Sequence, residues 1–181
     1  MRNPAPDRGA FPPSVRVVVN TSPSRREIRV QIESRFEFLD LVQQMAEDVC
    51  RVSGFHRNST LNVGLAVREA VVNAIKHGNR QEAGKRVEVI FRLGSRKLVV
   101  VVRDQGVGFD PENVRNPLAA SNIFRANGRG IFFMKNFVDD VVFQRLDRGG
   151  MEVRMEKKIE KRRRGRHGAG TARASEGGEV G

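Results

Sequence analysis

Three polar residues are spaced four apart in the stretch VREAVVNAIKHGN, residues 67–79, which is otherwise apolar enough to form a core helix. On a helix, Glu69, Asn73 and His77 would turn by only about 40° per step, so their side chains would form one stripe. A carboxylate, an amide and an imidazole in register could do chemistry, whereas a helix that needed only solubility would more naturally carry Lys/Glu pairs there. A solvated polar face that ends in a histidine explains the same residues without chemistry. The stripe alone leaves both interpretations open.

A second candidate is RDQGVGFDP, residues 103–111. A buried strand is predicted to end at Asp104, and Gly106 and Gly108 follow in a turn open enough for backbone to approach a ligand. A carboxylate fixed at a strand end can accept a hydrogen bond from an exocyclic amine such as adenine N6. A tight Asp/Gly turn is the simpler alternative. The stretch fails the EF-hand pattern, because the twelfth position is Arg115 rather than Glu, and no P-loop occurs in the chain.

The third candidate is ANGRGIFFMKNF, residues 126–137, in which Gly128 and Gly130 flank Arg129 and open into a predicted helix. Backbone N–H groups at a helix start, with a guanidinium beside them, suit a polyphosphate. Glycine near a helix start is common, so this motif by itself is compatible with an ordinary helix end.

The elements that must position these residues follow from hydrophobic periodicity. The pattern predicts helices and hairpins without strict alternation, which favours an α+β fold. The expected architecture is a two-layer sandwich whose mixed or antiparallel sheet is covered on one face by helices. In chain order, the prediction begins with a strand at 26–34, a helix within 35–55 that ends at Ser53-Gly54, and a helix from a cap at Asn58 or Ser59 to His77, which Gly78 stops. A hairpin at 87–102 turning at 94–95, a loop at 109–128, a helix from Gly130 and a hairpin at 141–159 turning at 147–150 follow.

The chain divides into a domain at 27–158 and two tails. Five of the seven prolines fall in the first 23 residues, so 1–26 is predicted to be a flexible arm. Residues 159–181 form a predicted disordered basic tail. Eight Lys or Arg against three Glu from 157 to 181 supply +5 of the net charge of +12. We therefore expect no specific nucleic-acid site, only non-specific contacts of this tail.

Other classes of protein are disfavoured by composition. No apolar run approaches the length of a membrane span, and no secretory signal precedes the domain, so a cytoplasmic location is the expectation. The single cysteine, Cys50, cannot form an internal disulfide, and three scattered histidines do not build a zinc site. Cys50 is predicted to be a buried thiol rather than a nucleophile.

Taken together, the three motifs resemble a known superfamily. ExxxNAxxHG at 69–78, DxGxGFD at 104–110 and GxGIFFM at 128–134 resemble the N, G1 and G2 boxes of the Bergerat-fold ATPases. EAVVNAIKHGN, RNPL at 115–118 and GRGIFFMKNFVDDV resemble more closely the small anti-sigma-factor serine kinases within that superfamily. The similarity covers roughly residues 27–158.

The resemblance implies roles for the residues already singled out. Asn73 would ligate Mg²⁺, Glu69 would be the general base, and Asp104 would hold adenine N6 in a pocket shaped by Gly106 and Gly108. The lid over the ATP phosphates would contain the phosphate-contacting residues Gly128, Arg129 and Gly130, with Arg125 as an alternative cation. His77 would lie at the mouth of the site, where a structural or nucleotide-edge role and a catalytic role are alternatives.

The function implied by this resemblance is that of an ATP-dependent serine/threonine protein kinase. It would phosphorylate an anti-anti-sigma protein, sequester a sigma factor and form a homodimer. A nucleotide-gated binding module without phosphotransfer is the main alternative. A detached histidine-kinase catalytic domain is disfavoured because His56 lies in a predicted loop and residues 1–26 are too short for a phospho-acceptor hairpin. A DNA-binding protein would rest on the basic tail alone.

Overall fold

The described strands form a six-stranded sheet in the order β1-β2-β3-β4-β6-β5 in the computed structural model, which describes residues 14–22, 25–107 and 129–159. Each neighbouring pair is antiparallel. The prediction of an α+β fold is confirmed, and of the two sheet types expected the antiparallel one is present. The strands are β1 (Val15–Ser22), β2 (Arg25–Glu33), β3 (Arg86–Leu93), β4 (Lys97–Arg103), β5 (Asp140–Arg145) and β6 (Met151–Lys158).

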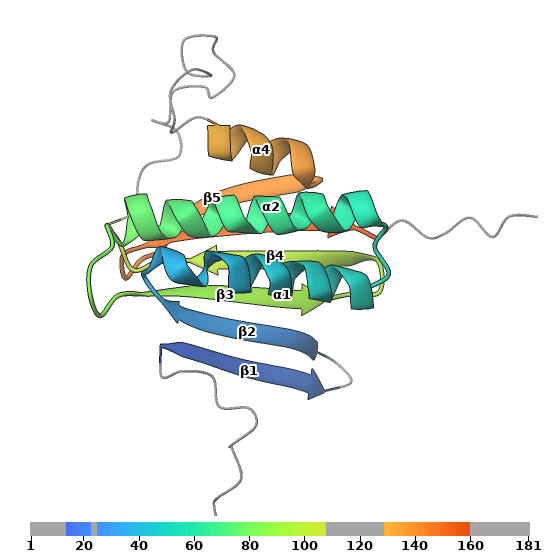
Figure 1. Ribbon diagram of the computed structural model, residues 1–181, viewed down its shortest axis with the longest axis horizontal. Helices are drawn as coiled ribbons and strands as arrows, with labels where there is room; N and C mark the ends of the chain where they lie inside the picture. The colour runs from blue at the N-terminus through green and yellow to red at the C-terminus, as the bar shows by residue number, and fades with distance from the viewer. Residues whose placement is uncertain (1–13, 23–24, 108–128, 160–181) are drawn as a thin grey trace, which may run out of the picture.

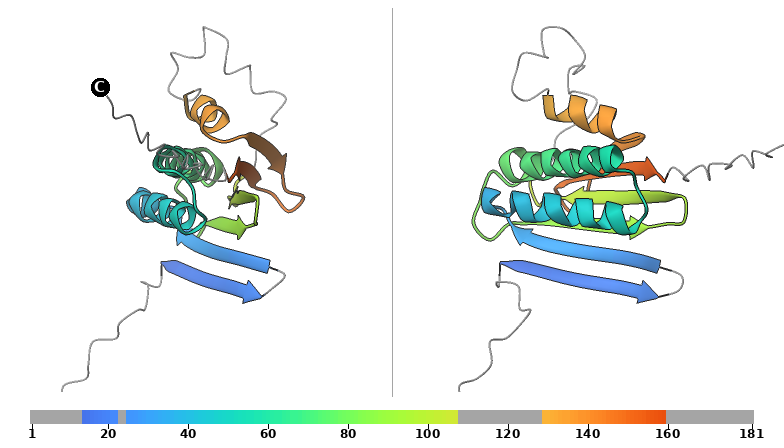
Figure 2. Two further views of the ribbon diagram at one scale, coloured as in Figure 1. Left: turned by 90° about the vertical axis from the view of Figure 1, so that its right-hand side faces the viewer. Right: turned by 45° about the vertical axis from the view of Figure 1, so that its right-hand side comes forward.

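The helices form the second layer. A short 3₁₀ turn, η1 (Phe36–Phe38), leads into α1 (Leu39–Val52), which lies side by side with α2 (Arg57–Asn73) over one face of the sheet (Figure 1). A turn of π-helix, η2 (Ala74–Gly78), extends α2, and α4 (Arg129–Phe137) packs along the other flank of α2 (Figure 2). Of the helices in the described ranges, none combines the length and the apolar character needed to cross a bilayer.

The core lies between the helices and the sheet. Side chains alternate across a strand, so every second residue of the central strands points at the helices. Cys50 is fully buried in this layer, as predicted, and burial raises the pKa of its thiol to about 12. The buried strand residues that face the helices include Val30, Ile32, Val87, Val89, Phe91, Leu98, Val100 and Val102. Those of the helices include Val42, Ala46, Val49, Val63, Ala66, Val67, Ala70 and Val71.

In the described part of the chain, the opposite face of the sheet carries ion pairs and no helix. Arg29 contacts Glu27 and Glu88, both at 2.9 Å. Arg103 contacts Glu88 at 3.3 Å and Glu152 at 2.7 Å. A small separate apolar cluster, Ile90, Val99 and Val101, is buried among these charged side chains. The helix α2, which carries the predicted polar stripe, lies on the other face.

Part of the predicted N-terminal arm is a strand. β1 occupies residues 15–22 inside the segment 1–26, and it pairs with β2 from Val15 opposite Ile32 to Ser22 opposite Arg25. The prediction of a flexible arm is wrong for these residues. The run VRVVV has high strand propensity, but an edge strand forms only when a partner strand is available. Residues 1–13 lie outside the described ranges.

The start of the second helix also differs from the prediction. Neither Asn58 nor Ser59 caps it, because α2 begins at Arg57 with His56 in the N-cap position. His56 is extended and makes no side-chain cap hydrogen bond, but its carbonyl accepts the first helical bond from Thr60 N at 2.9 Å. This boundary therefore forms without a capping side chain. The two predicted hairpins, β3–β4 and β5–β6, are confirmed.

Candidate functional site

Glu69 and Asn73 face the beginning of α4. A methyl group placed on Gly130 would lie 2.8 Å from Oε2 of Glu69, 3.4 Å from Nδ2 of Asn73 and 3.8 Å from its Oδ1. Both side chains are half-buried, whereas Gly130 is buried. The structure therefore brings together one predicted residue of the third motif and two of the first, although more than fifty residues of chain separate them.

His77 is placed differently from the other two members of the stripe. The α-helical pattern changes after Asn73 to the wider turn η2, in which Asn79 N donates to the carbonyl of Ala74 at 2.7 Å. His77 is exposed on this turn, and partial burial together with the positive charge of Lys76 lowers the pKa of its imidazole. The imidazole is therefore held toward its neutral form, which disfavours a role as a fixed cation.

Asp104 follows β4 directly and is only 7% exposed. Its Oδ1 accepts hydrogen bonds from Gly106 N at 2.9 Å and from Met151 N at 3.2 Å. Burial raises the pKa of this carboxyl, and the two accepted backbone bonds and the charge of Lys85 oppose that rise. Since both hydrogen bonds found within the described ranges end on Oδ1, Oδ2 is the oxygen that can accept a bond from a ligand.

Two glycines let the backbone pack directly against Asp104 and the turn that follows it. A methyl group on Gly78 would lie 2.3 Å from Cγ of Asp104, and one on Gly106 would lie 2.1 Å from the carbonyl oxygen of Gly78. Real side chains do not approach that closely, so only glycine lets these two segments meet. The sequence places Gly78 directly after the predicted helix that ends at His77 and does not predict its contact with the Asp104 carboxylate. Neither residue type nor spacing signals it.

A buried amide next to this contact was also missed. Asn79 is fully buried and bonds to the backbones of Arg86 and Gln105, the residue after Asp104. The one available signal was an asparagine directly after the glycine of the first motif. Its neighbours Arg80 and Gln81 both have positive φ, 55° and 56°, which marks a sharp exit from η2.

Several predicted site residues cannot be placed. Gly108, Arg125 and Gly128 lie outside the described residues, and for Arg129 only the backbone, as the first residue of α4, is described. The predicted contacts of these residues with phosphate therefore stay predictions. Gly130 is the one described glycine of the third motif.

The donor set beside Gly130 fits Mg²⁺. This ion takes oxygen ligands, retains several waters and commonly binds through one or two protein groups. The amide oxygen of Asn73 and the carboxylate of Glu69 approach one point at the start of α4, so they could share such an ion's surroundings. No group of three or more His, Cys, Asp or Glu side chains occurs within 14–22, 25–107 and 129–159, which argues against an all-protein metal cage there.

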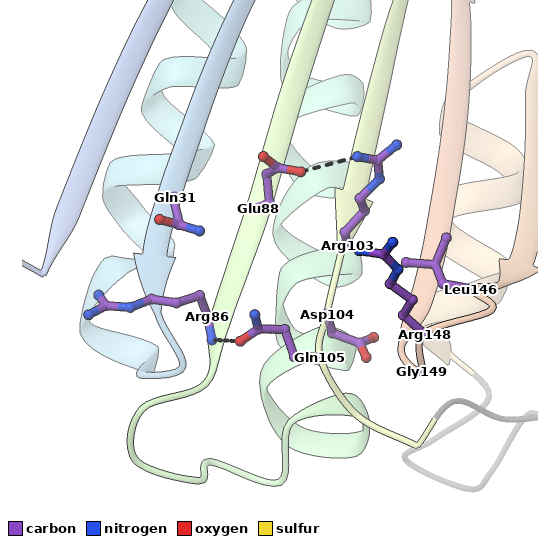
Figure 3. Close-up of a pocket in the computed structure, with 9 residues that line it drawn as sticks. All are labelled: Gln31, Arg86, Glu88, Arg103, Asp104, Gln105, Leu146, Arg148 and Gly149. Atoms are coloured by element: carbon purple, nitrogen blue, oxygen red, sulfur yellow. Dashed lines mark hydrogen bonds and ion pairs between the residues drawn. The ribbon is translucent and has the colours of Figure 1, made fainter.

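A cavity of about 350 Å³ lies on the other side of the sheet from Glu69 and Asn73. Figure 3 shows Gln31, Glu88 and Arg103 in front of the strands, while the helices lie behind. The ion pair between Arg103 and Glu88 crosses this cavity. This cavity has only the Asp104–Gln105 segment in common with the site that contains Glu69 and Asn73, so the two are separate.

The geometry thus has two ends joined by one turn. Glu69 and Asn73 lie at one end, and the buried Asp104 lies at the other, where Gly78 at the end of η2 touches it. Such a layout suits an extended ligand with a polyanionic end near the amide and carboxylate pair and an amine near Asp104.

The model of the family described as histidine kinase-like ATPase domain matches residues 32–157, and the chain belongs to that family, as the Bergerat motifs predicted.

Individual relatives narrow the class. The chain is 26% identical over 141 residues to the serine-protein kinase RsbW of Bacillus cereus and to that of Bacillus anthracis, spanning 75% of this chain and 86% of theirs. The serine-protein kinase RsbW of Bacillus thuringiensis is 25% identical over the same length. The predicted resemblance to serine kinases of this fold is therefore confirmed.

Proposed function

We propose that the protein is an ATP-dependent serine/threonine kinase that acts as an anti-sigma factor. It phosphorylates an anti-anti-sigma protein and sequesters a sigma factor when that protein is absent or already phosphorylated. The observation that carries the proposal is the approach of Glu69 and Asn73 to the start of α4 at Gly130. The similarity to proteins named serine-protein kinase supports the same reaction.

In this proposal Asp104 selects the nucleotide. Its Oδ1 is occupied by backbone donors, so Oδ2 accepts a hydrogen bond from the 6-amino group of adenine. Gly78 packs its backbone directly against the carboxylate and Gly106 packs against Gly78, which fixes the Asp104 side chain, and Gly108 completes the adenine pocket. His77 lies near the edge of the nucleotide.

Glu69 is the general base in this proposal. Its carboxylate accepts the proton of a substrate serine or threonine hydroxyl as the hydroxyl oxygen bonds to the γ-phosphorus. The bond from that phosphorus to the bridging oxygen of the β-phosphate breaks, and ADP leaves with the bond's electron pair. Asn73 is the protein ligand of Mg²⁺, which when bound neutralises charge on the phosphate oxygens. Arg129 or Arg125, with Gly128 and Gly130, closes over the phosphates.

The partners and setting are part of the same proposal. An anti-anti-sigma protein is the phosphate acceptor and a sigma factor is the sequestered partner, so the protein acts in the cytoplasm, where transcription occurs. The working form is a homodimer. The basic residues at 159–181 contribute only non-specific contacts with nucleic acid.

Phosphate transfer to the acceptor protein tests this proposal. Incubation with Mg-ATP and a candidate anti-anti-sigma protein should produce phosphoserine or phosphothreonine, located by mass spectrometry. Glu69→Ala should abolish transfer while ADP affinity is retained. Glu37→Ala, which removes an exposed carboxylate paired with Arg35, is the matched control and should transfer normally.

Two results would redirect the interpretation. Undiminished transfer by Glu69→Ala would remove Glu69 from the role of base. ATP-dependent capture of the partner without any incorporated phosphate would instead support a nucleotide-gated binding module, the main alternative from the sequence.

A further inference from the structure

Asn79 closes a ring of hydrogen bonds between three segments of the chain. Its Nδ2 donates to the carbonyl of Arg86 at 2.9 Å, and its Oδ1 accepts from Gln105 N at 2.7 Å. The ring is completed by Arg86 N, which donates to Oε1 of Gln105 at 2.7 Å, the dashed contact at the lower left of Figure 3. Asn79 has no exposed surface, so its amide depends on these two partners.

The ring lies next to the residue proposed to select adenine. Each backbone N–H of the segment 104–106 is held by a different acceptor. Asp104 N donates to Met151 O at 3.0 Å, Gln105 N donates to Asn79, and Gly106 N donates to Asp104 Oδ1 at 2.9 Å. The bonds of Asp104 and Gly106 stay within the sheet layer and the turn. The bond that Gln105 N donates to Asn79 connects this segment to the end of the helix that carries Glu69.

Asn79 is itself fixed to the helix layer. Its backbone N–H donates to the carbonyl of Ala74 across η2 at 2.7 Å, and Ala74 follows Asn73 directly. The preceding residue, Gly78, touches the Asp104 carboxylate. One buried side chain therefore links the segment that carries Asp104 to the end of the helix that carries Glu69 and Asn73.

We propose that Asn79 is a positioning residue for adenine recognition. It holds the Asp104–Gly106 segment against η2 so that the free oxygen of the Asp104 carboxylate meets the 6-amino group of adenine. The inference rests on the proposed function, in which Asp104 accepts that hydrogen bond. It adds that the selectivity of the site for adenine depends on a residue that touches no nucleotide atom.

A purely architectural role makes a different prediction. If Asn79 only stabilised the fold, its removal would lower the affinity for all nucleotides to the same extent. If Asn79 acts through Asp104, its removal lowers the affinity for a nucleotide with the 6-amino group and leaves the affinity for one without it unchanged. The relevant quantity is the ratio of Kd values for ADP and its 6-desamino analogue, purine riboside diphosphate.

The experiment measures both Kd values by calorimetry for the full chain and for three variants. The wild-type protein should bind ADP about tenfold or more tightly than the desamino analogue, because a hydrogen bond to a charged group contributes about that factor. Asn79→Ala should reduce this preference to about twofold, mainly by weakening ADP. Gln105→Ala removes one exposed link of the ring and should reduce the preference by a smaller factor. Gln44→Ala, an exposed glutamine on α1, is the matched control and should leave it unchanged.

Amide hydrogen exchange in the nucleotide-free protein supplies a second measurement. Exchange at Gln105 should become faster in Asn79→Ala, because its N–H loses its acceptor, while amides of α1 keep their wild-type rates. This readout does not depend on any nucleotide. If Asn79→Ala fails to fold, Gln105→Ala still decides the question.

The outcomes separate the two levels of inference. A wild-type protein without preference for ADP over the desamino analogue would overturn the assignment of Asp104 in the proposed function. A wild-type preference that both ring variants retain in full would overturn the positioning role of Asn79 and leave that assignment standing.

Discussion

The α-carbon of Gly130 abuts the carboxylate of Glu69, so closely that a methyl group on the glycine would lie 2.8 Å from Oε2. The contact joins the start of α4 to the C-terminal part of α2, and it leaves room for no side chain between them. A residue proposed as the catalytic base is thus held against the helix that opens the third motif. The distance makes Gly130 a sensitive point at which to move Glu69 without changing it.

Gly130→Ala should therefore separate activity from stability. The atom in the way is the far end of a flexible side chain, which can swing aside, and alanine suits a helix better than glycine by about 0.5–1 kcal/mol. The variant should keep or slightly raise its Tm. Phosphate transfer should fall by about tenfold or more, because the displaced carboxylate no longer meets the hydroxyl. Transfer at the wild-type rate would show that the position of Glu69 beside Gly130 is not needed.

Gly78→Ala, unlike Gly130→Ala, should lower stability. The atoms that its methyl group would meet belong to Asp104, at 2.3 Å from Cγ, and this carboxylate is held by two backbone donors. It cannot swing aside, so the overpacking should cost about 2 kcal/mol or more. Both the free energy of unfolding in urea and ADP affinity should fall.

Gly84→Ala is a suitable control for that comparison. Gly84 has φ of +87° and nothing within 4 Å of an added methyl group. The substitution should cost about 1 kcal/mol through backbone strain alone and leave ADP affinity unchanged. Equal losses of ADP affinity in the Gly78 and Gly84 variants would contradict a special role for the contact between Gly78 and Asp104.

Asp104→Asn should abolish adenine recognition without weakening the fold. The amide oxygen can keep both backbone bonds, but an NH₂ group replaces the oxygen that would accept from adenine, so ADP affinity should drop by about tenfold or more. Burial raises the pKa of this carboxyl above its ordinary value of 3.8, so the folded state binds the proton more tightly than the unfolded state. Its contribution to stability is present at low pH and is lost as pH rises through the folded pKa. The stability of the variant relative to wild type should increase over that pH range.

Asp48→Asn provides the control of opposite sign. A hydrogen bond from Arg51 lowers the pKa of the exposed Asp48 carboxyl, so its contribution is present above the unfolded pKa and is lost as pH falls. Urea unfolding of both variants between acid and neutral pH measures the two slopes. A stability difference for Asp104→Asn that falls as pH rises would contradict the burial argument.

Cys50 should be inert in the folded protein. With a thiol pKa of about 12, only roughly one molecule in ten thousand carries the thiolate at pH 8. Labelling by a thiol reagent should therefore follow unfolding and become complete in denaturant. Since Cys50 is the single cysteine, its labelling rate measures opening of the layer between helices and sheet. Rapid labelling under native conditions would show that this part of the core opens locally.

Much of the fold could be predicted from local pattern. The alternation in β2 and β3, the continuous apolar run of β4, and the periodicity of α1 and α2 follow from the faces that each segment buries. Glycines mark the turns of both hairpins. The strand β1 could not be predicted in this way. Its pairing with β2 is made between segments, and the prolines around it suggested a flexible arm.

Part of the candidate site could also be predicted from local pattern. Glu69 and Asn73 share a helix, so their spacing alone places them on one side of it. The position of His77 could not be predicted in this way. The α-helix widens into η2 after Asn73, and this wider turn is closed by the hydrogen bond from Asn79 N to the carbonyl of Ala74. Asp104 was predictable as the polar end of a buried strand, but its environment was not.

The sequence by itself determined the class of protein, since residue types, order and spacing of three short motifs are properties of the chain. The tertiary structure decided which atoms meet. Gly130 against Glu69, Gly78 against Asp104, and the ring through Asn79, Arg86 and Gln105 all join segments distant in the chain. Such contacts depend on how helices pack on a sheet to within a fraction of an ångström, and no local periodicity encodes that distance.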